Sequence, residues 1–213
     1  MTLNIVDLSS NNGPVNLATL KKAGCDGVII KATESNWYVN QYFASQVKQA
    51  ARLGMLIGTY HYSDGGSVSA NINHYWDTVK PYAKYIDWHI LDYEGRNIIR
   101  GGVGHAYLAL KTMKRLTGKT PMIYMGLSDE NSHNWSSVTS YPLWVAQYND
   151  MSNHYGFNPR AMYGHLRNWK KMAMFQYSAT SYIGGIGPVD ASVYYGSKSS
   201  LNKGSVAMSE HWK

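Results

Sequence analysis

The sequence is poor in cysteine, and it contains no long uncharged apolar run. Cys25 is the single cysteine among 213 residues, which excludes an intrachain disulfide and a cysteine-rich zinc site. Because Cys25 follows Gly24 beside the apolar run 27–30, we expect a small buried side chain there. No apolar segment has the length needed to cross a bilayer, so we expect no membrane insertion. The first residues also lack the basic and apolar regions of a signal peptide.

Acidic residues are scarce as well. The chain has 13 Asp and Glu against 20 Lys and Arg, which gives a formal net charge of +7. A positive surface attracts polyanions, and both nucleic acid and an anionic cell wall fit that description. The basic residues are scattered without a dense run, so an ordinary solubilising surface is the alternative for most of them.

Phenylalanine is the third scarcity: the chain has 3 Phe against 18 Tyr and 7 Trp. Tyr and Trp rings can stack on a ligand and also offer a hydrogen bond, which suits a wet binding groove. Carbohydrate and single-stranded nucleic acid are both ligands of that kind.

Short apolar runs alternate with amphipathic segments through the first two thirds of the chain. The expected strands in this part are 3–8, 27–32, 57–62, 89–94 and 121–125. The expected helices between them are 16–24, 41–53, 67–79 and 104–116, with a weaker one at 128–138. Three further strands follow at 142–148, 172–177 and 189–195, without good helical stripes between them.

This order predicts an α/β fold, an irregular TIM-like barrel of the form (β/α)5(β)3. Repeated strand–helix units imply parallel strands with right-handed crossovers, and eight strands can close into a barrel. We expect one domain over residues 1–196. Residues 197–213 are rich in Ser, Lys and Gly, and we expect a linker or a disordered tail there.

Two carboxylates end the fourth expected strand, at Asp92 and Glu94. Side chains two apart on a strand share a face and lie roughly 7 Å apart along the backbone. Glycoside hydrolysis needs a carboxylic acid that protonates the leaving oxygen and a second carboxylate near the anomeric carbon. Their proximity would also raise one pKa, which keeps one group protonated. Taken alone, such a pair is more often a solvated strand edge.

Two more carboxylates favour the catalytic interpretation. Asp7 ends the first expected strand and Asp190 lies on the eighth, and these strands are neighbours in a closed barrel. The strand ends of such a barrel carry its active site. Acidic groups gathered there repel each other, so their convergence does not stabilise the fold and indicates a functional site.

An ordered set of segments resembles glycoside hydrolase family 25, the N-acetylmuramidases or Chalaropsis-type lysozymes common among phage endolysins and bacterial autolysins. The resemblance runs from about residue 3 to about residue 196. The segments are Asp7-Leu8-Ser9 with Asn12-Gly13, Lys31-Ala32-Thr33-Glu34, Gly58-Thr59-Tyr60-His61-Tyr62, Leu91-Asp92-Tyr93-Glu94, Pro142-Leu143-Trp144-Val145-Ala146-Gln147-Tyr148, Phe175-Gln176-Tyr177-Ser178 and Val189-Asp190.

Three positions depart from the family pattern. Ser35 stands where the family usually has Gly, Phe175 stands where it usually has Trp, and Ser192 stands where it often has Asn or another polar residue. None of these changes removes a carboxylate.

The resemblance implies hydrolysis of the β-1,4 bond between N-acetylmuramic acid and N-acetylglucosamine in peptidoglycan, with net retention. Glu94 would be the general acid/base, and Asp92, Asp7 and Asp190 would shape the field at the anomeric carbon. A covalent intermediate and attack by the substrate's own acetamido group both stay open. The Asp-x-Glu spacing is similar to that of chitinases that use substrate assistance, which favours the second route.

Aromatic and amide side chains near the strand ends are candidates for sugar binding. Alternate residues on a strand face the barrel wall, so about half of the aromatic ones are expected to be packing. No metal or other cofactor is expected, because His61 and His89 lack a third ligand at a suitable spacing. The candidates are Tyr60, Tyr62, Tyr124, Trp144, Gln147, Gln176 and Tyr177.

The expected partner is bacterial peptidoglycan, with a Gram-positive wall favoured by the positive charge. Nucleic acid is not expected, because an acidic groove repels phosphates. The alternative from another class is a non-catalytic barrel that binds cell-wall carbohydrate. We expect synthesis in a host cytoplasm without a signal peptide and action at the wall's extracellular face. Whether a C-terminal cell-wall-binding domain follows the tail stays open.

The charge balance generates a first prediction. Teichoic acids and muropeptides make Gram-positive walls anionic, so long-range attraction would concentrate a protein of charge +7 on the wall. Salt screens that attraction. Turnover on whole cells is therefore expected to fall as ionic strength rises, and a flat salt profile would contradict the expectation.

Overall fold

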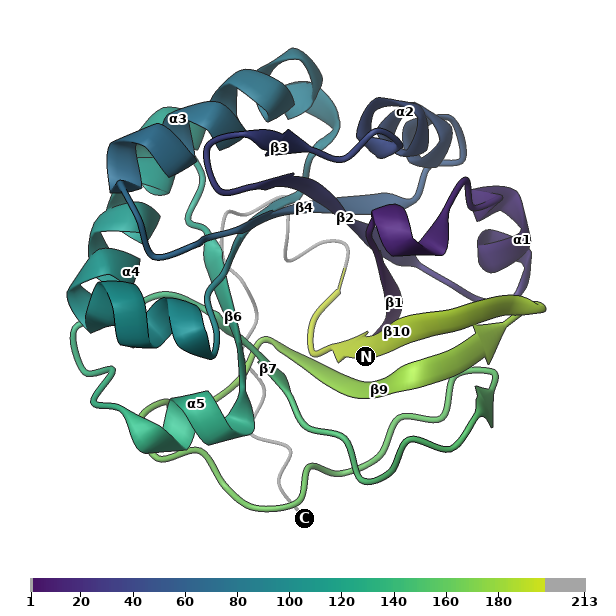
Figure 1. Ribbon diagram of the computed structural model, residues 1–213. Coiled ribbons are helices and arrows are strands. Elements are labelled where there is room, and N and C mark those ends of the chain that lie inside the picture. The colour runs from purple at the N-terminus through teal and green to yellow at the C-terminus, as the bar shows by residue number, and fades with distance from the viewer. Residues whose placement is uncertain (1, 198–213) are drawn as a thin grey trace.

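The computed structural model describes residues 2–197 and shows a closed β-barrel with helices on its outside (Figure 1). Two short strands, β3 (Tyr38–Val39) and β8 (His154–Tyr155), only attach to the edges of longer ones. The other strands close on themselves through pairing of β1 with β2 and β10. They are β1 (Leu3–Leu8), β2 (Gly27–Glu34), β4 (Leu56–Tyr62), β5 (Trp88–Asp92), β6 (Met122–Gly126), β7 (Leu143–Ala146), β9 (Met174–Ile183) and β10 (Ile186–Tyr194).

The predicted fold class is confirmed: the protein is a mixed α/β barrel closed by eight strands. Adjacent strands from β1 through β2, β4, β5, β6 and β7 to β9 are parallel. The predicted tail falls almost wholly on residues 198–213, outside the described residues. The single-domain boundary at residue 196 therefore stays a prediction.

The last strand departs from this parallel order. β10 is antiparallel to both β9 and β1, because Gly184 and Gly185 join β9 to β10 in a two-residue turn with φ of 61° and 84°. Positive φ at both turn positions is the geometry of a tight hairpin, which glycine adopts without steric cost. Asp190 therefore does not end a parallel strand. It lies in the middle of a reversed strand and pairs in register with Asp7.

The helices cover the outside of the barrel (Figure 1). The α-helices are α1 (Leu17–Lys22), α2 (Phe43–Arg52), α3 (Val68–Val79), α4 (Arg96–Thr117) and α5 (Leu127–Ser132), and the 3₁₀ turns are η1 (Ser10–Asn12) and η2 (Lys80–Tyr85). α4 begins earlier than predicted and is kinked at Gly102, where φ is 71°. α5 ends earlier than predicted because His133 is extended and Trp135 turns into the core.

Two apolar layers hold these elements together. The larger one lies between the strands and the helices and includes Ile30, Val47 and Leu110. The smaller one fills the inside of the barrel with residues such as Ile29 and Trp88, so the barrel is packed and is not a pore. Cys25 is buried, as expected. No helix within residues 2–197 is both long and apolar enough to cross a membrane.

A buried polar network joins the strands to α3. The imidazole Nδ1 of His61 lies 2.9 Å from the hydroxyl of Thr33, and its Nε2 lies 3.0 Å from the side-chain oxygen of Asn71. The Nδ1 of His89 lies 2.7 Å from the hydroxyl of Tyr75. Burial lowers the pKa of His61 to about 4 and that of His89 to about 3.

These histidines predict a loss of stability in acid. In the unfolded chain an imidazole takes up a proton near pH 6.5, whereas buried His89 stays neutral down to about pH 3. The unfolded state therefore binds more protons between these values, and stability falls as the pH falls. His89→Asn, which keeps a polar atom near the Nδ1 position, should lose roughly 2 kcal/mol less than the wild type between pH 7 and 4.5. Denaturant unfolding at both pH values measures the difference, and equal losses would contradict it.

Candidate active site

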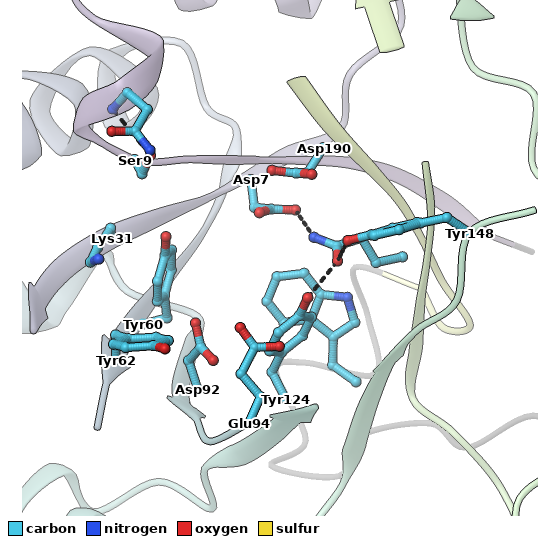
Figure 2. A pocket seen from close by; sticks show the side chains of 13 residues that line it. Asp7, Ser9, Lys31, Tyr60, Tyr62, Asp92, Glu94, Tyr124, Tyr148 and Asp190 are labelled. Atoms are coloured by element: carbon cyan, nitrogen blue, oxygen red, sulfur yellow. Dashed lines mark hydrogen bonds between the residues drawn. The ribbon is translucent and has the colours of Figure 1, made fainter. Parts of the chain in front are cut away.

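All four predicted carboxyl groups line one cavity at the barrel mouth (Figure 2). The cavity has a volume of about 270 Å³ and a polar lining. It is lined by Asp7, Ser9, Asn11, Lys31, Tyr60, Tyr62, Asp92, Glu94, Tyr124, Trp144, Tyr148, Gln176 and Asp190.

Strand alternation places Asp92 and Glu94 side by side. Asp92 is the last residue of β5, and Glu94 lies two residues beyond it. The N–H of Tyr93 donates to the carbonyl of Tyr124 at 3.1 Å, which continues the strand pairing past the end of β5. Tyr93 points to the other face, where its ring stacks on His105 at 5.2 Å. Asp92 and Glu94 thus both face the cavity, as predicted.

Asp7 and Asp190 face this pair from across the cavity (Figure 2). Paired residues on neighbouring strands point to the same side of the sheet, and Asp7 pairs with Asp190 in the β1–β10 ladder. Closure of the barrel by a reversed last strand is therefore what brings residues 7 and 190 together.

A glutamine with fixed orientation holds Asp7. The hydroxyls of Tyr124 and Tyr148 both donate to Oε1 of Gln176, at 2.7 and 2.6 Å. The amide of Gln176 must then direct its Nε2 donor the other way, and it donates to Oδ2 of Asp7 at 2.8 Å. Through Gln176, the two tyrosines thus orient the amide that donates to Asp7.

Burial sets the protonation of the site. Asp7 and Asp92 are 7% and 8% exposed, and desolvation raises the pKa of both well above the usual range. The charge of Asp190 raises the pKa of Asp7 further, and that of Glu94 does the same for Asp92. Burial first and Glu94 second raise the pKa of Asp190 to about 6. Repulsion among the four groups therefore favours protonation of some of them.

Glu94 has its own source of a raised pKa. Burial raises it first, and the charge of Asp129 raises it further. Asp129 lies in the first turn of α5, and its Oδ2 accepts the N–H of Gly95 at 3.0 Å. A carboxyl group with a raised pKa is suited to act as a general acid.

One basic group lies among the carboxyls. Lys31 is the only lysine or arginine among the described residues that line the cavity. Its ammonium pairs with Glu34 at 2.6 Å, and its charge lowers the pKa of Asp92 in opposition to burial. Lys31 was not predicted as a site residue, although it stands in a segment that carries the family resemblance.

The predicted sugar-binding residues divide into two groups. Tyr60, Tyr62, Tyr124, Trp144 and Gln176 line the cavity as expected. Tyr124 and Trp144 pack edge to face at 4.5 Å, and Trp144 is 2% exposed, so this pair forms the cavity floor.

Gln147 and Tyr177, in contrast, are not among the residues that line the cavity. Gln147 lies just past β7, where its Oε1 accepts from Arg160 at 3.0 Å and from the N–H of Tyr163 at 3.0 Å. Tyr177 directly follows Gln176 on β9, so it faces the opposite side and is buried in the outer core.

Besides Lys31, four residues near the carboxyls were missed by sequence reasoning. Ser9 and Tyr148 belong to segments that carry the family resemblance but were assigned no role, and Asn11 lies in the turn that follows the first strand. Asp129 had no local signal, because only the fold brings α5 next to Glu94.

The three departures from the family pattern fall outside the carboxyl cluster. Ser35 adopts φ of 51°, a left-handed conformation that favours glycine, and its hydroxyl donates to Asp64 at 3.0 Å. Phe175 faces the outer core. The hydroxyl of Ser192 accepts the indole N–H of Trp144 at 3.2 Å.

His61 and His89 are not arranged as metal ligands. His61 and His89 are engaged in the buried network behind the strands. Over residues 2–197, no three or more His, Cys, Asp or Glu side chains gather in a way that could hold a metal ion.

Comparison with known proteins gives related sequences and folds. Lysozyme M1 of Streptomyces globisporus is 25% identical over 212 residues, covering 92% of this chain and 69% of its own length. The lysozyme of Streptococcus phage Cp-1 is 28% identical, with coverages of 72% and 47%. The uncharacterized protein YegX of Escherichia coli K12 is 29% identical and covers 81% of this chain, which spans 60% of its length.

Solved structures share the fold. The catalytic domain of endolysin ply40 from bacteriophage P40 of Listeria monocytogenes has a TM-score of 0.77 at 22% identity, covering 96% of this chain and 97% of its own. A family 25 glycosyl hydrolase from Bacillus anthracis has a TM-score of 0.75 at 18% identity, with coverages of 94% and 92%.

The family itself is shown by a match over most of the chain. Residues 6–186 match the sequence pattern described as glycosyl hydrolases family 25. The matched range includes Asp7, Asp92 and Glu94, and it ends just before Asp190. This protein therefore belongs to glycosyl hydrolase family 25.

Proposed function

We propose that this protein is a peptidoglycan hydrolase that cleaves the β-1,4 bond between N-acetylmuramic acid and N-acetylglucosamine, with Glu94 as its general acid/base. The observation that carries the proposal is a half-buried Glu94 with a raised pKa, beside Asp92 and opposite Asp7 and Asp190 in one polar cavity. Membership of family 25 and relatives named as lysozymes support the same activity.

The chemistry follows from the two protonation states of Glu94. In the first step the protonated carboxyl gives its proton to the glycosidic oxygen, and the bond from that oxygen to the anomeric carbon breaks. In the second step the Glu94 carboxylate takes a proton from water as the water oxygen bonds to that carbon. Ionised groups among Asp7, Asp92 and Asp190 stabilise the positive charge that develops between these steps.

Retention through the substrate's acetamido group is the route we propose for the intermediate. The acetamido oxygen attacks the anomeric carbon as the leaving group departs, and water later opens the resulting ring. Asp92 is placed beside Glu94 to orient and stabilise that group. Its Oδ1 is buried without a hydrogen-bond partner among the described residues, so a substrate N–H would supply a donor that the protein does not.

The proposed partner is a Gram-positive wall, reached from the extracellular side. The net charge of +7 favours binding to an anionic wall polymer. Inside the cavity, the acidic side chains disfavour the binding of phosphates at the reaction centre, which argues against nucleic acid as the substrate.

Mass spectrometry of digested, borohydride-reduced peptidoglycan tests the bond that is cut. Reduced muramic acid ends are expected. Reduced glucosamine ends would identify a glucosaminidase, and free amino groups would identify an amidase or a peptidase. The absence of new ends would favour a non-catalytic carbohydrate-binding barrel.

Glu94→Gln tests the catalytic residue. Glutamine has nearly the same shape but carries no transferable acidic proton, so lysis should fall by roughly 10²- to 10⁴-fold while binding to purified walls is kept. The matched control is Asp77→Asn, which removes one negative charge on the exposed face of α3 and should leave lysis unchanged. Unchanged lysis in Glu94→Gln would contradict the assignment.

Asp129→Asn tests whether the charge of Asp129 raises the pKa of Glu94. Glu94 works in its protonated form, so activity is lost as the pH rises through its pKa. The charge of Asp129 raises that pKa, and its removal should lower it. The alkaline limb of kcat/KM should then move to lower pH, while an asparagine oxygen can still accept the Gly95 N–H. A limb that stays in place, or that moves upward, would contradict the role of Asp129.

A further inference from the structure

Trp37 is an exposed indole on an ordered turn. It lies between β2 and β3, and 70% of its surface is exposed. A tryptophan usually contributes to stability through burial, and this one contributes little in that way. An indole that is presented to water offers a flat apolar face to a ligand, with an N–H at its edge.

Hydrogen bonds from three directions hold this turn. The hydroxyl of Tyr38 donates to the Ser10 hydroxyl at 2.7 Å, and Nε2 of His74 on α3 donates to the Tyr38 carbonyl at 3.0 Å. The side-chain amide of Asn40 donates to the backbone carbonyl of Lys31 at 2.9 Å. The indole is therefore carried by a pre-organised support, so binding to it need not order a loose loop.

The turn is continuous with the cavity through a row of side chains. The Trp37 ring packs edge to face on Tyr38 at 5.8 Å. The ammonium of Lys31 lies 5.5 Å from the centre of the Tyr38 ring and 5.1 Å from that of Tyr62. Lys31 and Tyr62 line the cavity. Tyr38 also hydrogen-bonds to Ser10, whose neighbours Ser9 and Asn11 line the cavity as well. The row thus leads from the carboxyls to the rim.

The cavity by itself is too small to enclose a polymer chain. Its volume of about 270 Å³ lies just below the range of pockets that enclose small molecules, roughly 300–1,000 Å³. A glycan strand continues beyond the sugars at the scissile bond, so most of it must lie outside the cavity. The β2–β3 turn presents an exposed aromatic ring that Tyr38 and Lys31 connect to the cavity lining.

We propose that Trp37 is a distal sugar-binding platform, on which a pyranose ring of the same glycan strand stacks outside the catalytic cavity. The proposal rests on the proposed function, because the ligand is the strand whose bond is cut. The apolar C–H face of a sugar fits the indole face. Because Trp37 is remote from the carboxyls, this contact would strengthen ground-state and transition-state binding equally, so it acts on KM and leaves kcat unchanged.

The experiment measures binding separately from cleavage. Titration calorimetry in the Glu94→Gln background would compare soluble peptidoglycan glycan strands with a tetrasaccharide of the same repeat. Trp37→Ala should weaken strand binding roughly fivefold or more and leave tetrasaccharide binding unchanged. Trp37→Phe, which keeps a stacking ring, should retain most of the affinity. Leu108→Ala, at an exposed apolar residue of α4, is the matched control and should change neither.

Kinetics with Glu94 intact give a second readout. Trp37→Ala should raise KM for strands by the same factor and leave kcat unchanged. Strand affinity equal to the wild type, or an equal loss for both ligands, would overturn the platform. If the wild type releases no new reducing ends, the proposed hydrolysis fails, whereas the length-dependent binding in the Glu94→Gln background tests Trp37 independently.

Discussion

Repulsion among carboxyl groups that are withdrawn from water is the constraint on which this structure depends. Asp7 and Asp92 are almost fully buried, and Glu94 and Asp190 face the same small cavity. Their raised pKa values mean that the folded state binds more protons than the unfolded chain above about pH 4, so this cluster destabilises the fold as the pH rises. The two apolar layers and the closed strand ladder must offset that cost. In return, the same repulsion keeps a proton available for transfer.

The fold meets this constraint with backbone geometry. The β9–β10 turn reverses the last strand and sets Asp190 opposite Asp7 in the ladder. On the other side of the cavity, Tyr93 anchors the chain between Asp92 and Glu94, because its ring stacks on His105 and its hydroxyl donates to the Gly102 carbonyl at the kink of α4. Each pair of acids is thus held by the arrangement of the neighbouring chain, and within residues 2–197 no salt bridge neutralises either pair.

Much of this arrangement can be predicted from the sequence, because strands and their carboxyls are local signals. The run that ends in Asp92 and Glu94 has the alternation that directs both groups to one face, and the structure keeps it. Which residues of β9 face the inside of the barrel was harder to predict. Gln176 and Tyr177 are both compatible with a sugar site, and only the position of β9 in the barrel determines which one faces inward. The reversal of β10 had a signal in Gly184-Gly185 between two apolar runs, which indicates a hairpin. Asp129 had none, since it reaches Glu94 only through tertiary packing.

The central claim is that the cavity raises the pKa of Glu94 above the usual range of glutamate, and a direct titration tests it. Carbon-13 NMR of the side-chain carboxyls, assigned with Glu94→Gln and Asp190→Asn, would report the pKa of each group in the folded protein. The account predicts that Glu94 titrates above the usual range of glutamate and that Asp190 titrates near pH 6. Ordinary values for both groups, near pH 4, would contradict it.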